Sequence, residues 1–265
     1  MSVKWVIQNN LGSSEDIGRL VNSCDELSLP FELVKAIPFS EELPDIDTDQ
    51  ATMFYGSTNF VTNIFDSGRW QPGVFFDHDK FRFSTWREKY KEEVLNSNAE
   101  ITTIREFAER PLKGLSNIFV RPNDDSKSFA GNIFEEREFK TWCEGLCSAD
   151  DLSIKSETKI IVAEAVQLEF EWRLFVVDKK VSSGSKYREN FRITVSPDVP
   201  GEVIDFAEDL AKVWTPNDVF VMDICSSGGE LYVIEVNCMN SSGFYANNVK
   251  KIVSDISAFV STAVA

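Results

Sequence analysis

Two apolar segments near the C-terminus, Val219–Ile224 and Leu231–Val236, restrict the fold more than any other part of the chain. The Ser-Ser-Gly-Gly sequence between them predicts a tight turn, so we expect the segments to pair as an antiparallel hairpin. A loop at Gly228-Gly229-Glu230 would then place Asp223 directly opposite Glu235. The sequence therefore predicts two carboxylates facing each other across neighbouring strands.

Side chains alternate between the faces of a strand, so Asn237 is expected on the same face as Glu235. The opposite face is expected to be an apolar core face, formed by Phe220, Met222, Ile224, Tyr232, Ile234 and Val236. Opposed carboxylates about 5 Å apart repel by roughly 3 kcal/mol at an effective dielectric near 20, unless water screens them or a cation bridges them. Because oxygen ligands of this kind suit magnesium, Asp223, Glu235 and Asn237 form a candidate magnesium site. An ordinary exposed acidic face is the alternative.

The rest of the chain predicts an α/β fold. In the first third, strand patterns at Val3–Ile7, Phe31–Ile37 and Ala51–Tyr55 alternate with helix signals, which favours a small parallel α/β unit. Helices are expected at Thr85–Leu95, where Thr85 and Glu88 have the spacing of a capping box, and after Thr103 and Glu106, which repeat that spacing. Later segments read as strands, followed by two amphipathic helices expected at 201–214 and 247–263.

Composition excludes several classes of function. The formal charge of −16 disfavours general binding to nucleic acid or to anionic membranes. No apolar run approaches the roughly 20 residues of a membrane span, and no signal peptide is evident, so we expect a cytoplasmic protein with reduced thiols. His78 is the only histidine and lies among aspartates, where a loop residue is expected more often than a catalyst.

The hairpin resembles the magnesium site of the ATP-grasp superfamily, in which an acidic residue ends one strand and Glu-x-Asn ends the next. Upstream, Ile118–Pro122 is similar to the strand that brings a basic residue to the phosphates of ATP, with Arg121 in place of the usual lysine. The segment 125–131, which contains Lys127 and Gly131, resembles the flexible phosphate loop. The arginine variant is similar to a clade found in phages and bacteria.

Two further strands complete the resemblance. Ile161–Val166 looks like the strand and linker against which adenine packs, which implies nucleotide contacts for Glu164, Ala165 and Val166. The strand with Glu171 and Arg173 looks like the one whose side chains face nucleotide and substrate, although an exposed ion pair is the alternative. Arg121 is alternatively a surface cation at a strand end. Lys186, Tyr187 and Arg188 could receive an anionic substrate or belong to a solvated loop.

The resemblance implies an N-terminal α/β domain over residues 1–84 and an ATP-grasp domain over 85–265, divided into subdomains 85–165 and 166–265. It also implies a ligase that uses ATP and Mg²⁺, with Arg121, Lys127 and Arg173 as catalytic residues. A carboxylate on a small molecule or peptide would form an acylphosphate, which an amine-type acceptor then opens. Two alternatives stay open: another ATP-dependent transfer, such as a kinase or an enzyme modifying RNA or peptide ends, and a non-enzymatic acidic binding protein with a degenerate nucleotide site.

Overall fold

The N-terminal unit is a parallel α/β layer. The computed structural model describes residues 2–38, 40–125, 128–148 and 154–263. The first strands form a four-stranded parallel sheet of order β2-β1-β3-β4, as the strand and helix alternation predicts. Ser13 caps the first helix, and Ser57 caps the second, each through its side-chain oxygen. The elements are β1 (Lys4–Gln8), α1 (Ser14–Glu26), β2 (Phe31–Val34), β3 (Thr52–Tyr55), α2 (Thr58–Ser67) and β4 (Pro72–Gly73).

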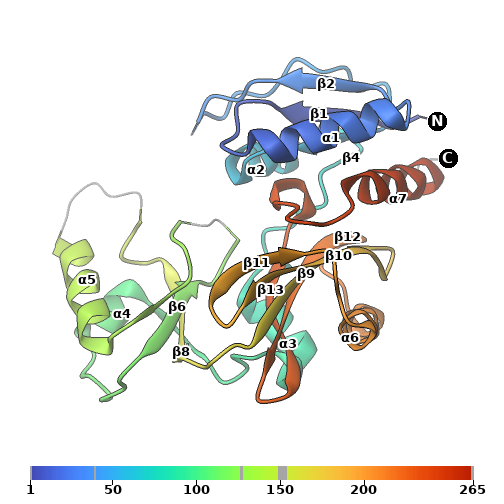
Figure 1. Cartoon of the computed structure of the whole chain (residues 1–265). Helices are drawn as coiled ribbons and strands as arrows, with labels where there is room; N and C mark the ends of the chain where they lie inside the picture. Colours follow the sequence, from blue (N-terminus) through green and yellow to red (C-terminus); the bar gives the residue numbers. More distant parts are fainter. Residues whose placement is uncertain (1, 39, 126–127, 149–153, 264–265) are drawn as a thin grey trace.

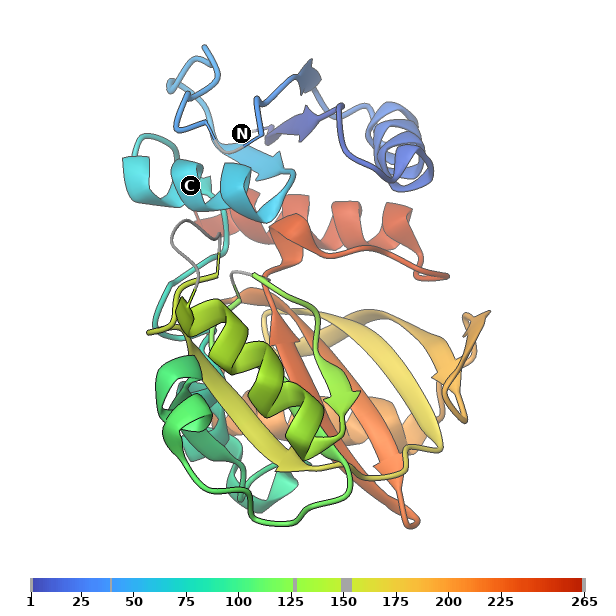
Figure 2. The ribbon, with the colours of Figure 1, turned by 90° about the vertical axis from the view of Figure 1, so that its left-hand side faces the viewer.

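The middle of the chain forms a second, antiparallel layer, seen at the left of Figure 1 and in front in Figure 2. Its four strands have the order β5-β8-β6-β7, and α4 and α5 cover one face through a cluster that includes Phe107 and Phe139. The capping box of Thr103 and Glu106 is present at the start of α4. The elements are β5 (Glu100–Thr103), α4 (Ile104–Glu109), β6 (Ile118–Pro122), β7 (Asn132–Phe134), α5 (Glu136–Ser148) and β8 (Lys159–Glu164).

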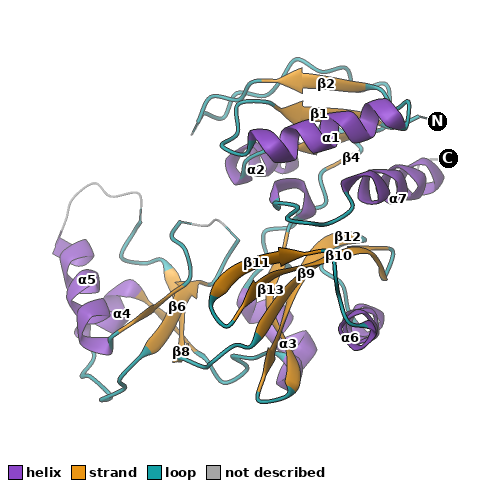
Figure 3. Cartoon of the chain, in the orientation of Figure 1, coloured by secondary structure: helices purple, strands orange, loops and turns teal. Residues whose placement is uncertain are grey.

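The C-terminal part forms a five-stranded antiparallel sheet of order β11-β10-β9-β12-β13. One face packs against α3 and α6, with Trp86 and Leu210 in the shared core. The other face packs against α7, which lies between this sheet and the N-terminal layer (Figure 1, Figure 3). The elements are α3 (Phe83–Tyr90), the 3-10 turns η1 (Lys91–Glu93) and η2 (Met239–Ser241), β9 (Phe170–Val177), β10 (Lys180–Glu189), β11 (Arg192–Ser196), α6 (Gly201–Val213), β12 (Val219–Ser227), β13 (Glu230–Asn237) and α7 (Val249–Ala263).

The hairpin of β12 and β13 pairs Asp223 with Glu235, as predicted, but its turn and one of its faces differ from the prediction. The turn contains only Gly228 and Gly229, both at positive φ, as a two-residue hairpin turn requires. The extra residue is taken up by a bulge at Ile234, because Ile224 pairs with Val233 instead of with its expected partner.

The bulge changes which side chains of β13 reach the core. Val233 is fully buried in the core, whereas Tyr232 and Ile234 are only half-buried and lie outside it. The prediction that Tyr232 and Ile234 belong to the apolar face is therefore wrong, because the bulge moves Val233 into that position. The apolar face does contain Phe220, Met222, Ile224 and Val236.

The predicted start of the helix at Thr85 is also wrong. α3 begins at Phe83, two residues earlier, and Asn123 of the neighbouring layer accepts hydrogen bonds there from the backbone N–H groups of Phe83 and Ser84. The Thr85 hydroxyl instead donates to the carbonyl of Asp79 at 2.7 Å. A tertiary contact therefore replaces the local capping box.

Candidate active site

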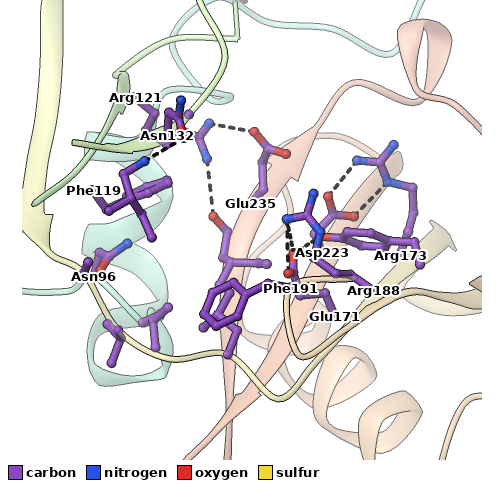
Figure 4. Close-up of a pocket in the computed structure, with 18 of the residues that line it drawn as sticks. Asn96, Phe119, Arg121, Asn132, Glu171, Arg173, Arg188, Phe191, Asp223 and Glu235 are labelled. Atoms are coloured by element: carbon purple, nitrogen blue, oxygen red, sulfur yellow. Dashed lines mark hydrogen bonds and ion pairs between the residues drawn. The ribbon is translucent and has the colours of Figure 1, made fainter. Parts of the chain in front are cut away.

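A cleft of about 400 Å³ lies between the middle layer and the five-stranded sheet. Most of the residues predicted for the site line this cleft, from strands far apart in sequence: Arg121, Gly131, Glu164, Ala165, Val166, Glu171, Arg173, Asp223 and Glu235 (Figure 4). Lys127 lies outside the described residues. The volume falls within the range of roughly 300–1,000 Å³ that is usual for small-molecule sites.

At one side of the cleft, Arg173 and Asp223 form a buried ion pair. They are cross-strand partners on β9 and β12. Arg173 donates through Nε to Oδ1 at 2.9 Å and through Nη2 to Oδ2 at 2.7 Å, a bidentate geometry. Burial raises the pKa of Asp223 above its ordinary value, and the guanidinium of Arg173 opposes that rise. The neighbour that offsets the charge of Asp223 is therefore an arginine.

The second carboxylate, Glu235, is paired from the opposite layer. Arg121 Nη2 lies 3.0 Å from Glu235 Oε1, and Arg121 Nη1 donates to the carbonyl of Ile234 at 3.3 Å. Across the cleft the charges thus follow the order Arg173, Asp223, Glu235, Arg121, with a cation outside each carboxylate. The predicted carboxylate repulsion is offset in this way by two arginines. The bulge at Ile234 is the place where the two layers meet.

The set Asp223, Glu235 and Asn237 fits a magnesium ion. Asn237 Nδ2 points to Asp223 Oδ2 at 3.5 Å, while its buried Oδ1 has no hydrogen-bond partner among the described residues. An orphaned amide oxygen beside two carboxylates is a suitable hard ligand set. The described residues contain no cluster of three or more His, Cys, Asp and Glu side chains suited to a metal. Magnesium needs only one or two carboxylates when phosphates supply the other ligands.

The other end of the cleft is apolar and flat-sided. Phe119 lines it together with Arg121, since the two residues share one face of β6. Gly131 is required there, because a Cβ at this position would lie 3.1 Å from the Phe119 ring and 3.3 Å from Arg121 Cβ. Ala165 and Val166, in the connection after β8, complete this end. Its shape and chemistry suit a planar heterocycle.

A third group of side chains surrounds Glu171, which is 4% exposed. The Tyr187 hydroxyl donates to Glu171 Oε2 at 2.8 Å, and Arg188 Nη1 lies 3.2 Å from Oε1. Burial, and then the carboxylates of Asp223 and Glu171, hold the pKa of Tyr187 well above its ordinary value, so that the hydroxyl stays protonated. The Tyr187 ring stacks on Tyr245 with a centroid distance of 4.8 Å.

The N-terminal layer supports this wall of the cleft. Arg19 of α1 donates to the carbonyls of Tyr245 and Asn247, which are close neighbours of the stacked rings. Arg173 Nη1 donates to the carbonyl of Gly243 at 3.3 Å in the same segment. The segment from Gly243 to Asn247 is therefore fixed from both sides.

Several lining residues were not predicted, among them Asn96, Phe119, Ile133, Leu168, Phe191 and Tyr245. Phe119 could have been found, because the period of a strand places it beside Arg121. The sequence carries no comparable signal for Tyr245. Lys186 does not reach the cleft, because a bulge in β10 between Lys186 and Arg188 turns it to the opposite face. His78 pairs with Asp66 on the surface at 2.8 Å and does not line the cleft.

Solved structures with the same fold are ATP-grasp enzymes. The D-cycloserine synthetase DcsG has a TM-score of 0.63 at 11% identity, with 98% of this chain and 100% of that chain covered. D-alanine–D-alanine ligase from Bacillus anthracis has a TM-score of 0.63 at 12% identity, covering 99% and 98%. The ATP-grasp ligase PsnB with its minimal precursor has a TM-score of 0.55 at 14% identity, covering 92% of each chain.

Other structures of two of these proteins hold cofactors, namely ATP in the Bacillus anthracis ligase and Mg with ADP in PsnB. No curated protein matches the chain by sequence. No helix in the described part of the chain is long and apolar enough to cross a membrane. Residues 97–254 match a family described as an ATP-grasp domain, family 2 of its clade. This match spans more than half of the chain and confirms the resemblance drawn from the hairpin, so the chain belongs to this ATP-grasp family.

Proposed function

We propose that this protein is a magnesium-dependent ligase that uses ATP to join a carboxylate to an amine-type nucleophile through an acylphosphate. The family and its structural neighbours support an ATP-dependent ligase. The substrate class follows from the neighbours named above, which include small-molecule ligases and a peptide ligase. A small molecule or a peptide that carries the carboxylate is therefore proposed here.

One observation supports the proposal most strongly: the orphaned Oδ1 of Asn237 beside Asp223 and Glu235, facing Arg121 across the cleft. A structural acidic patch would not need a buried amide oxygen without a partner. Bound magnesium would offset the negative charge that develops on the phosphates. Arg121 would hold phosphate oxygens, exchanging its contact with Glu235 for a planar, two-pronged contact with an anion.

The remaining side chains bind and orient. Phe119, Ala165 and Val166 would enclose the adenine ring at the apolar end of the cleft. Arg173 stays fixed on Asp223, and its cation would attract the substrate carboxylate toward the γ-phosphate. Attack of a carboxylate oxygen on the γ-phosphorus breaks the bond to the β,γ-bridging oxygen and releases ADP. The amine then attacks the acyl carbon, and inorganic phosphate and a proton leave.

Hydroxylamine trapping tests the reaction class. The protein is incubated with ATP, magnesium chloride, hydroxylamine and pools of amino acids, other carboxylic acids and acidic peptides. An acylphosphate gives a hydroxamate in step with ADP release, and the Glu235→Gln variant should give neither product. A phosphate ester formed without hydroxamate would instead identify a phosphotransferase. Failure of ATP with magnesium to stabilise the fold, where a ligand at 100 times its Kd adds about 2.7 kcal/mol, would remove ATP use altogether.

A further inference from the structure

A second concave surface lies on the opposite face of the five-stranded sheet. Strand alternation sends Glu171 and Arg173 into the cleft, and it sends Phe170 and Trp172 to the back of the sheet. A groove of about 1070 Å³ opens there between the strand ends, the connection that precedes α6, and the first turns of α6. The proposed ligase chemistry uses no residue of this groove.

The floor of the groove is apolar, and its rim is acidic. Phe170, Trp172, Phe206 and Leu231 provide large apolar side chains. The acidic lining residues come from five separate segments of the chain and are Glu93, Glu169, Asp198, Glu202 and Glu230. None of these five forms an ion pair with another described residue, whereas Glu100, Glu136 and Glu208 elsewhere on the surface each contact a lysine or an arginine. Carboxylates without cations are therefore concentrated around an aromatic floor.

The one basic residue of the groove is already occupied. Lys186 Nζ lies 2.7 Å from Glu189 Oε2 and 5.5 Å from the centre of the Phe170 ring. This contact also shows that the floor accepts a cation over an aromatic face. In addition, the buried Ser226 Oγ, from a residue that lines the groove and is 8% exposed, has no hydrogen-bond partner among the described residues.

We infer that this groove docks a cationic segment of another protein, in which lysine or arginine residues alternate with large apolar ones. The apolar side chains would cover Phe170, Trp172 and Phe206, and the basic side chains would pair with the acidic rim. A second copy of this chain is a poor occupant, since each copy carries a net charge of −16. Nucleic acid and anionic membranes are repelled for the same reason.

The test uses a fluorescein-labelled synthetic peptide of alternating lysine and tryptophan and measures binding to the full chain by fluorescence anisotropy. Two control peptides separate the contributions: alternating lysine and serine lacks the apolar side chains, and alternating glutamate and tryptophan reverses the charge. Binding of the lysine–tryptophan peptide alone is the expected result. Equal binding of the lysine–serine peptide would overturn the inference, because it would show charge attraction without a groove.

Matched charge reversals place the binding site. Glu169→Lys with Glu230→Lys changes the groove, while Glu41→Lys with Glu42→Lys makes the same change of net charge at exposed residues of the connection between β2 and β3. The groove pair should weaken binding about tenfold or more, which corresponds to about 1.4 kcal/mol, and the control pair by less than about twofold. Equal losses in the two pairs, or no binding by the parent, would overturn the inference. Both pairs should keep the parent's ATP turnover, so the result stands apart from the proposed ligase activity.

Discussion

Asp223 and Glu235 are both proposed metal ligands, yet the structure predicts that they contribute very differently to stability. The Asp223 side chain is 1% exposed and binds Arg173 through both oxygens, while the Arg173 side chain is 12% exposed. The Glu235 side chain is 32% exposed, and its partner Arg121 keeps hydrogen bonds to the carbonyls of Ile234 and Pro122. Removing one carboxylate therefore strands a buried cation, and removing the other does not.

The magnitudes follow from burial. Asp223→Ala leaves the guanidinium of Arg173 without its anion and should cost about 3–5 kcal/mol of unfolding free energy. Glu235→Gln breaks a partly solvated pair and should cost about 1 kcal/mol or less. In a urea titration these values correspond to a midpoint shift of about 1 M or more against a shift of a few tenths, for a slope near 3 kcal/mol/M.

The assay is urea unfolding of the apo-protein, followed by tryptophan fluorescence, since Trp172 adjoins Arg173 on β9. ATP turnover is measured in parallel, and both variants should lose it. The matched control is the double variant Asp223→Leu with Arg173→Met, which removes the ion pair as a unit and should regain most of the lost stability. Equal midpoints for Asp223→Ala and Glu235→Gln would refute the argument, as would a double variant no more stable than Asp223→Ala.

Two further outcomes are expected. Arg121→Lys should lower kcat/KM for ATP by about 1–3 kcal/mol of binding energy and Arg121→Ala by more, because an ammonium lacks the planar fork; parental turnover by Arg121→Ala would move the phosphate contact elsewhere. Val233→Ala should cost about 2 kcal/mol in urea unfolding, and Ile234→Ala less than about 1 kcal/mol with a raised KM for ATP; a reversed order would disprove the bulge.

Local pattern predicted the parts of the fold that depend on neighbours in sequence. The pairing of Asp223 with Glu235 follows from the distance of each residue from the glycine turn, and the parallel N-terminal layer follows from the alternation of strands and helices. The capping box at Thr103 forms because both of its members lie on one short helix. In each case the interaction is complete within a few residues or one hairpin.

The unpredicted features depend on contacts between distant segments. The bulge at Ile234 lies where Arg121, from another layer, binds the Ile234 carbonyl. The partner of Asp223 is Arg173 because β9 lies beside β12, an order of strands that no local pattern gives. Asn123 takes the place of Thr85 at the start of α3 for a similar reason. The boundaries proposed at residues 84/85 and 165/166 stay predictions, as do the roles of the individual site residues.

The strand that carries the proposed metal ligands also connects the cleft to the N-terminal layer. After Asn237, β13 continues directly into a segment that is held by that layer: Asn240 donates to the Phe54 carbonyl at 2.6 Å and accepts from the Phe75 N–H at 2.9 Å. A few residues later, Arg19 holds the carbonyl of Tyr245. Because no flexible linker intervenes, a substrate that contacts Tyr245 would keep a fixed position relative to Glu235 and Asn237. The N-terminal layer thus acts on the proposed chemistry by fixing this wall of the cleft, without placing its own side chains among the metal ligands.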